Sequence, residues 1–110
     1  MIRVQIWKTR EGAYRSFQCL GHADYSESGA DVVCAGVSAI VISTVNSLQD
    51  LLHEKVDCQC DEKDGGDLTV NILEDLSPKG QFLVDHMIYG LEWIQRQYGK
   101  RYLRYEIKEV

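Results

Sequence analysis

Residues 21–38 read GHADYSESGADVVCAGVS, and this stretch contains the change from strand to helix that decides the fold. Before it, residues 13–22 show the alternation of apolar and polar side chains that is typical of a half-buried β-strand. After it, apolar side chains recur every three or four residues, so we expect a long helix over residues 32–54. The small, polar residues 23–30 are expected to form the connecting loop, with Gly29 as its hinge.

The start of this helix combines a carboxylate, a thiol and a preceding histidine. Asp31 is a strong N-cap candidate, and its carboxylate would accept a hydrogen bond from the backbone N–H of Cys34. Cys34 would then be the third residue of the helix, where the helix dipole and a nearby imidazole both favour the reactive thiolate. A carboxylate this close raises the pKa of the thiol and so disfavours the thiolate. We therefore interpret Asp31 as structural first and as an orienter of His22 second.

The place of Cys34 at the helix start and the preceding His22 together suit nucleophilic attack by the thiol on a carbonyl carbon. His22 would accept the thiol proton or pair with the thiolate, and would later protonate the leaving amine. Backbone N–H groups at the helix start, those of Cys34 and Ala35, would hold the oxyanion. Ser38 lies one turn further on, where its hydroxyl could bond the sulfur or bond back to the Cys34 carbonyl. This chemistry needs no metal and no organic cofactor.

The direction of the His22 side chain depends on where the second predicted strand ends. In the second predicted strand, Phe17 and Cys19 point to one face. The opposite face carries Tyr14, Ser16, Gln18, Leu20 and His22. If Phe17 faces the helices, the imidazole points away from them unless Gly21 introduces a bulge or a kink. We therefore expect the strand to have ended by His22.

The loop after the histidine is expected to be mobile without substrate and to order over a bound peptide, because lids are drawn from segments of low stability. The residues singled out in it are Ala23, Asp24, Tyr25 and Gly29. Tyr25 could stack on an aromatic substrate side chain, although an exposed loop tyrosine is the ordinary interpretation.

Several residues in this stretch also match the pattern of a known protein family. The pattern that carries it comprises Gly21-His22-Ala23, Gly29, Asp31, Val33-Cys34-Ala35 and Ser38. The chain resembles, along nearly its whole length, the ribosomal-processing cysteine protease Prp family. The resemblance implies a bacterial, homodimeric cysteine endopeptidase that removes a short N-terminal extension from a large-subunit ribosomal protein precursor, cutting after an aromatic residue. It also implies that His22 and Cys34 are catalytic, with Asp31 and Ser38 beside them.

The composition fits one ordered domain over residues 1–110, since the chain is long enough for one core and too short for two. The N-terminus enters an alternating pattern without a signal peptide, so a cytoplasmic protein is expected. Residues 32–45 form the longest apolar run, which polar side chains interrupt. No run therefore approaches the roughly 20 residues that span a bilayer.

The net charge of −5 argues against direct nucleic-acid binding, which normally requires a basic surface. Acidic side chains gather in two loops, at Asp24, Glu27 and Asp31, and at Asp61, Glu62, Asp64 and Asp67. These loops could steer a basic protein partner, such as a ribosomal protein precursor. The plainer interpretation is a solvated surface that keeps a small domain soluble.

The four cysteines are expected to be reduced, because the chain shows no secretory signal. Cys58 and Cys60 share one face of a predicted strand, and a zinc site there would need two more ligands, with only His53 nearby. We interpret both, together with Cys19, as small buried hydrophobic side chains. Thiol redox chemistry is disfavoured, since Cys34 belongs to no C-x-x-C motif.

The long helix is apolar nearly all round in its first half, so we expect it to be the buried centre of the fold. Some of this surface could instead be a homodimer contact. Its predicted core stripe is Val33, Val37, Ile40, Val41, Thr44, Leu48, Leu51 and Leu52.

The remaining segments complete the predicted fold. Short alternating strands are expected near residues 2–7, 56–60, 68–73 and 103–107, with Gly65-Gly66 in a hairpin loop. A second helix is bounded by Ser77, Pro78 and Gly99, with the core stripe Leu83, Met87, Leu91, Ile94 and Tyr98. The order predicts an α+β two-layer sandwich, ββαββαβ, with a mostly antiparallel sheet and two helices on one face. The place of the last strand stays open.

Two functions from different classes stay open as well. The leading one is a cysteine endopeptidase that uses His22 and Cys34. The alternative is a non-catalytic module that binds ribosomal protein or the assembling ribosome, in which both side chains serve packing.

Overall fold

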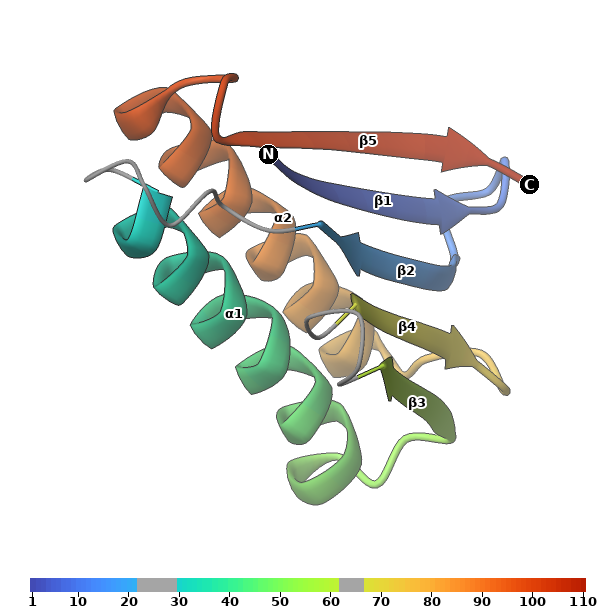
Figure 1. Cartoon of the computed structure of the whole chain (residues 1–110). Helices are drawn as coiled ribbons and strands as arrows, with labels where there is room; N and C mark the ends of the chain where they lie inside the picture. Colours follow the sequence, from blue (N-terminus) through green and yellow to red (C-terminus); the bar gives the residue numbers. More distant parts are fainter. Residues whose placement is uncertain (22–29, 62–66) are drawn as a thin grey trace.

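The computed structural model describes residues 1–21, 30–61 and 67–110, and its elements follow the predicted order. They are β1 (Ile2–Lys8), β2 (Tyr14–Leu20), α1 (Ala30–Asn46), the π-helical turn η1 (Ser47–Leu51), β3 (Val56–Asp61), β4 (Asp67–Ile72), α2 (Pro78–Tyr98) and β5 (Leu103–Glu109). Figure 1 shows both helices against one face of the five-stranded sheet. The predicted α+β two-layer sandwich is confirmed.

The strands lie in the order β3-β4-β2-β1-β5. Neighbouring strands are antiparallel except for β5, which lies parallel to β1 at the edge of the sheet. The 21 residues of α2 extend about 30 Å and return the chain to the end of the sheet where β1 begins. There the Ile2 amide donates to the Tyr102 carbonyl at 2.9 Å. The length of α2 thus decides the position of the last strand.

A β-bulge at Arg15 decides which way Tyr14 points. Tyr14 and Ser16 pair with successive residues of β1, so Arg15 has no residue opposite it. The extra residue reverses the alternation and buries Tyr14 on the helix side, where its hydroxyl donates to Asp85 of α2 at 2.6 Å. The prediction that Tyr14 lies on the face opposite to Phe17 is therefore wrong.

The core fills the space between the sheet and the two helices. The strands contribute Ile2, Val4, Ile6, Tyr14, Phe17, Leu68, Val70, Ile72 and Leu103. The helical segments contribute Val33, Val37, Val41, Val45, Leu48, Val84, Met87 and Leu91. Alternate residues of β1 are buried, which is the period of two that its sequence predicts.

Helix α1 begins at Ala30, two residues before the predicted start, and continues through η1 to Leu51. In η1 the Leu52 amide donates to the Ser47 carbonyl five residues back, so this turn is wider than an α-helical one. Leu51, the last residue of η1, is 73% exposed, and the prediction that it belongs to the core is wrong. Val45, which the predicted stripe omitted, is buried.

The outer face of α1 is more exposed than predicted, because Val32 and Ile42 are 52% and 51% exposed. By length and composition alone, the stretch Val32–Leu51 could cross a membrane, although a core helix can meet the same criterion. A third of its most apolar part is buried. The expectation that this helix is the buried centre of the fold is therefore wrong for its outer face.

Helix α2 begins and ends where predicted. The Ser77 side chain accepts a hydrogen bond from the Gly80 amide at 3.1 Å, Pro78 opens the first turn, and Gly99 closes the helix with φ of 103°. The buried residues of α2 are Gly80, Val84, Met87 and Leu91. Tyr98, which was predicted in the core, is 43% exposed in the last turn.

Candidate active site

Cys34 is the fifth residue of α1 and is half-buried against the core. The helix begins at Ala30, so Asp31 is its second residue and the predicted N-cap at Asp31 is wrong, as is the third helical position for Cys34. In an α-helix with this start, the N–H groups of Cys34 and Ala35 pair with carbonyls four residues back. The unpaired N–H groups belong to the first helical residues instead.

The backbone changes conformation at the end of β2, directly before His22. Gly21 has φ of 85°, and its amide donates to the Asp67 carboxylate at 2.9 Å. A Cβ at this position would lie 2.7 Å from the carbonyl oxygen of Met1, so one of the two groups would have to move. Glycine meets both conditions without strain. The strand has ended at Leu20, as predicted.

The predicted histidine and its loop lie outside the described residues. This applies to His22, Ala23, Asp24, Tyr25 and Gly29. The side chain of Asp31 is not described either. Contact between His22 and Cys34 therefore stays a prediction, and the described residues near Cys34 include Ser38 and Cys19.

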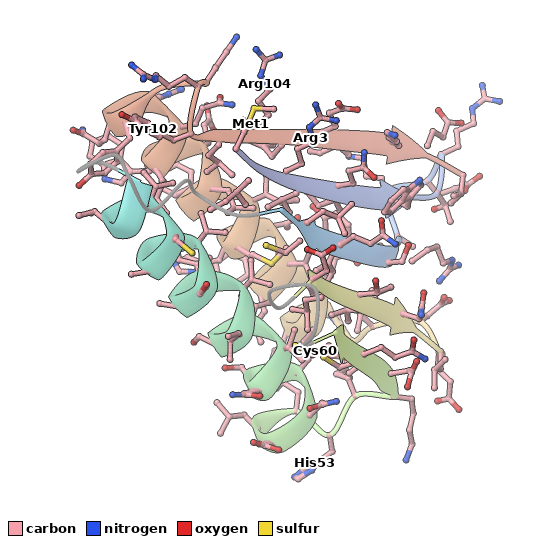
Figure 2. The ribbon with its side chains drawn as sticks, viewed as in Figure 1. Met1, Arg3, His53, Cys60, Tyr102 and Arg104 are labelled. Carbon is pink, nitrogen blue, oxygen red and sulfur yellow. The ribbon has the colours of Figure 1, made fainter. Side chains whose placement is uncertain are left out.

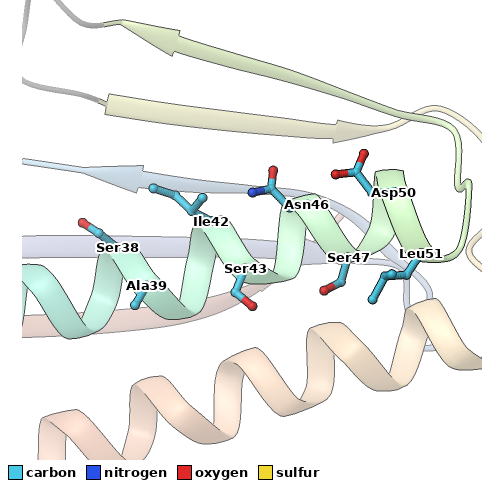
Figure 3. Close-up of a pocket in the computed structure, with 8 residues that line it drawn as sticks. All are labelled: Ser38, Ala39, Ile42, Ser43, Asn46, Ser47, Asp50 and Leu51. Carbon is cyan, nitrogen blue, oxygen red and sulfur yellow. The ribbon is translucent and has the colours of Figure 1, made fainter.

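Ser38 is exposed one helical turn beyond Cys34. It lines a cavity of about 60 Å³ between α1 and the sheet, together with Cys19, Val41, Ile42, Cys60 and Leu68. It also borders a larger hollow of about 550 Å³ along the outer face of α1. In Figure 3 this hollow extends from Ser38 to Asp50 and Leu51 at the far end of the helical segment. Ser38 is thus accessible from two sides.

Cys19 of β2 lies close enough to Cys34 for the two groups to interact electrostatically. Burial, followed by the charges of Cys34 and Asp67, raises the pKa of the Cys19 thiol to about 11. Burial also raises the pKa of Cys58, with a smaller contribution from Cys60. Cys19 and Cys58 are therefore protonated and weakly nucleophilic at neutral pH. Cys60 is exposed, so the prediction that it is buried is wrong.

Cys58 and Cys60 share the helix-facing side of β3, as predicted, because they pair with the buried residues Val70 and Leu68. Within residues 1–21, 30–61 and 67–110, no three His, Cys, Asp or Glu side chains are grouped to hold a metal ion. His53 does not join the two thiols in such a group. A zinc site on these residues has no support in the part of the chain that the structure describes.

Comparison with protein families identifies the class to which this fold and thiol belong. The family model described as "Cysteine protease Prp" matches residues 1–103. The protein is therefore a cysteine protease, and hence a hydrolase. More particularly, the chain belongs to the cysteine protease Prp family, and the resemblance found in its sequence is confirmed.

Two relatives both carry the name ribosomal processing cysteine protease Prp. The protein from Bacillus subtilis (strain 168) is 37% identical over 102 residues, which cover 89% of this chain and 90% of the relative. The protein from Staphylococcus aureus (strain Mu50 / ATCC 700699) is 32% identical over 100 residues, which cover 91% of this chain and 93% of the relative.

Solved structures share the fold over nearly the whole chain. The S. aureus ribosomal processing protease Prp in complex with a substrate peptide has a TM-score of 0.88 at 30% identity. The same protease with a covalently linked product peptide has a TM-score of 0.87 at 31% identity. Both matches cover 98% of this chain and 100% of the other.

Two features of the site were not predicted from the sequence. The first is the contact of Gly21 with Met1. A glycine between a strand and a histidine indicated a change in the backbone there, but it did not indicate which residue lies against it. The second is the proximity of Cys19 to Cys34. Both depend on pairing between segments that are distant in the sequence, and periodicity within one segment does not report such pairing.

Proposed function

We propose that this protein removes a short N-terminal extension from a large-subunit ribosomal protein precursor and cuts after an aromatic residue. Membership of the cysteine protease Prp family supports proteolysis, and the name of the relatives supports a substrate among ribosomal proteins. The observation that carries the proposal is Cys34, a partly exposed thiol in the second turn of α1. In the sequence, His22 lies between β2, which ends at Leu20, and this helix, which begins at Ala30.

In the proposed mechanism, His22 takes the proton of Cys34 and the thiolate attacks the scissile carbonyl carbon. The carbonyl oxygen becomes an oxyanion in the tetrahedral intermediate. Collapse of this intermediate breaks the C–N bond, and His22 returns the proton to the leaving amine. Water then hydrolyses the thioester with His22 as general base, which regenerates the thiol. The product peptide covalently linked to the S. aureus relative supports a covalent route.

The residues around this pair have supporting roles in the proposal. Asp31 would orient His22 from the first turn of α1, where a carboxylate also interacts favourably with the helix dipole. Ser38 would donate a hydrogen bond to the sulfur from one turn away. The Cys34 and Ala35 amides would hold the oxyanion if the first turn opened on substrate binding, and otherwise the unpaired N–H groups of the first helical residues would do so.

We further propose that the protein acts as a homodimer in the cytoplasm, where ribosomal proteins are made. The exposed surface of α1 and η1 supports a subunit contact, because Val32, Ile42 and Leu51 are all at least half exposed. Light scattering after size exclusion should give the mass of a dimer. Leu51→Glu should shift this mass to that of a monomer, and a monomeric wild type would contradict the proposal.

Cleavage of a precursor with an aromatic N-terminal extension tests the mechanism directly. We expect Cys34→Ala to abolish cleavage and His22→Ala to slow it by about 10²- to 10⁴-fold. Cys19→Ala is the matched control, because it removes a neighbouring thiol that is protonated at neutral pH. Mass spectrometry of the product identifies the bond that is cut. Cleavage that survived Cys34→Ala would contradict the proposed nucleophile.

Alkylation separates the protease from a non-catalytic binding module. The exposed Cys60 is first replaced in Cys60→Ser, so that it cannot compete for iodoacetamide. Near neutral pH we expect Cys34 to be labelled well before Cys19 and Cys58, whose pKa values are raised by burial. Equally slow labelling of all three thiols would favour the binding module.

A further inference from the structure

Two arginines lie side by side on the face of the sheet that the helices leave open. Arg3 of β1 and Arg104 of β5 are directly opposite each other in the parallel pair. Their neighbours Ile2 and Leu103 are also opposite each other and are buried, so both arginines point away from the helices. Figure 2 shows the two side chains near Met1, at the end of the sheet where β1 begins.

Among the residues that the structure describes, no carboxylate neutralises this pair. The ion pairs Arg15–Asp75, Arg96–Glu92 and Lys108–Glu106 in the described part of the chain do not include Arg3 or Arg104. Glu106 lies two residues further along β5, and its carboxylate contacts Lys108 at 3.8 Å. Like charges directly opposite each other on neighbouring strands destabilise a sheet. The arginine pair therefore lowers the stability of the fold unless an anion binds to it.

The turn between α2 and β5 adds positive charge beside this pair. Lys100 is exposed, and its carbonyl accepts a hydrogen bond from Nε of Arg104 at 3.4 Å. Arg3, Arg104 and the adjoining turn residue Lys100 thus lie at one corner of a chain whose net charge is −5. We name this group the basic corner.

We propose that the basic corner binds the phosphate backbone of single-stranded RNA. Guanidinium groups form bidentate hydrogen bonds with phosphate oxygens, and two of them on strands about 4.8 Å apart can hold one phosphate together or two in succession. The next row across the open face begins with Glu106, whose carboxylate contacts Lys108, and continues through Gln5, Gln18, Thr69 and Gln59. The uncharged donors and acceptors of the last four residues suit base edges and sugar hydroxyls.

An acidic peptide would also match the charge of the corner, so binding of such a peptide is compared with binding of RNA. The choice of RNA rests in part on the proposed function, because a ribosomal protein precursor is assembled with ribosomal RNA. The corner also lies beside Met1, which contacts Gly21 at the end of β2.

Fluorescence anisotropy with a labelled single-stranded RNA of about twelve nucleotides tests this assignment on the full chain. Wild type is compared with the double variant Arg3→Gln, Arg104→Gln. The matched control is Arg10→Gln, Lys79→Gln, which removes the same charge from exposed positions outside the corner. At about 50 mM salt we expect the first variant to bind about tenfold more weakly or worse, and the control about twofold. Loss of two phosphate contacts should also reduce the slope of log K against log salt by about 1.4.

Three results would overturn the proposal. They are an absence of RNA binding by wild type at about 50 mM salt, equal weakening in the two double variants, and stronger binding of a glutamate-rich peptide than of RNA of equal charge. The melting temperature of the arginine variant should not fall, since the substitution removes a repulsion. The anisotropy measurement requires no cleavage, so it stays interpretable even if the protease assignment fails.

Discussion

Replacement of Gly21 by alanine should weaken both the fold and the site, and its cost can be worked out from the backbone. At φ of 85°, a residue with a Cβ costs about 1–2 kcal/mol more than glycine. The added Cβ would also lie 2.7 Å from the carbonyl oxygen of Met1, and overfilling a packed position costs about 1–3 kcal/mol. We expect Gly21→Ala to lower the free energy of unfolding by about 2–5 kcal/mol.

Gly12→Ala is the matched control for this change. Gly12 also has positive φ, at 96°, but a Cβ there would meet nothing within 4 Å. We expect this variant to lose about 1–2 kcal/mol, which corresponds to the backbone contribution alone. The difference between the two variants measures the close approach of Gly21 to Met1.

Urea unfolding followed by circular dichroism gives both free energies, and precursor cleavage below the unfolding range reports on the site. We expect kcat/KM to fall further in Gly21→Ala than in Gly12→Ala, because any shift at Gly21 is passed directly to His22. Equal destabilisation of the two variants would refute the role of the Met1 contact. Full activity of a destabilised Gly21→Ala would refute the link between this turn and catalysis.

Three further changes test other contacts in the fold. Ser77→Ala removes the N-cap of α2 and should lower the free energy of thermal unfolding by about 1 kcal/mol, whereas Ser77→Asp should stay close to wild type. Tyr14→Phe removes the hydrogen bond to Asp85 and should cost about 1–2 kcal/mol in urea unfolding, with an unchanged m-value. Stability should fall as pH rises from about 9 to about 11, because folding raises the pKa of Cys19 and the unfolded chain releases that proton first. Cys19→Ala should reduce this fall by up to about 2–3 kcal/mol in urea titrations at several pH values, and an unaltered pH dependence would count against the raised pKa.

The boundaries of α2 illustrate what local sequence can predict. Ser77, Pro78 and Gly99 act on hydrogen bonds within their own turn, so their residue types were sufficient to place both ends of the helix. The candidate nucleophile was found in the same way, because residues 21–38 contain the histidine, the helix start and the thiol in one window. That window also carried the family resemblance, which comparison with known proteins confirmed.

The errors in the sequence analysis came from strand pairing and from departures from regular helix geometry, which side-chain periodicity does not report. Tyr14 was assigned to the wrong face because the bulge at Arg15 is visible only in the pairing of β2 with β1. Leu51 was assigned to the core because a regular helix was assumed where η1 forms a wider turn. The net charge is a sum over the chain, so it did not report that Arg3 lies opposite Arg104.

The sequence by itself determined the order of the elements, the ends of α2 and the thiol that we propose as the nucleophile. These follow from hydrogen bonds and periodicities that span a few neighbouring residues. Only the tertiary structure decided that β5 lies beside β1, that Gly21 contacts Met1, and that Arg3 faces Arg104. The physical reason is that strand register and helix length set which distant residues become neighbours, and no single segment contains that information.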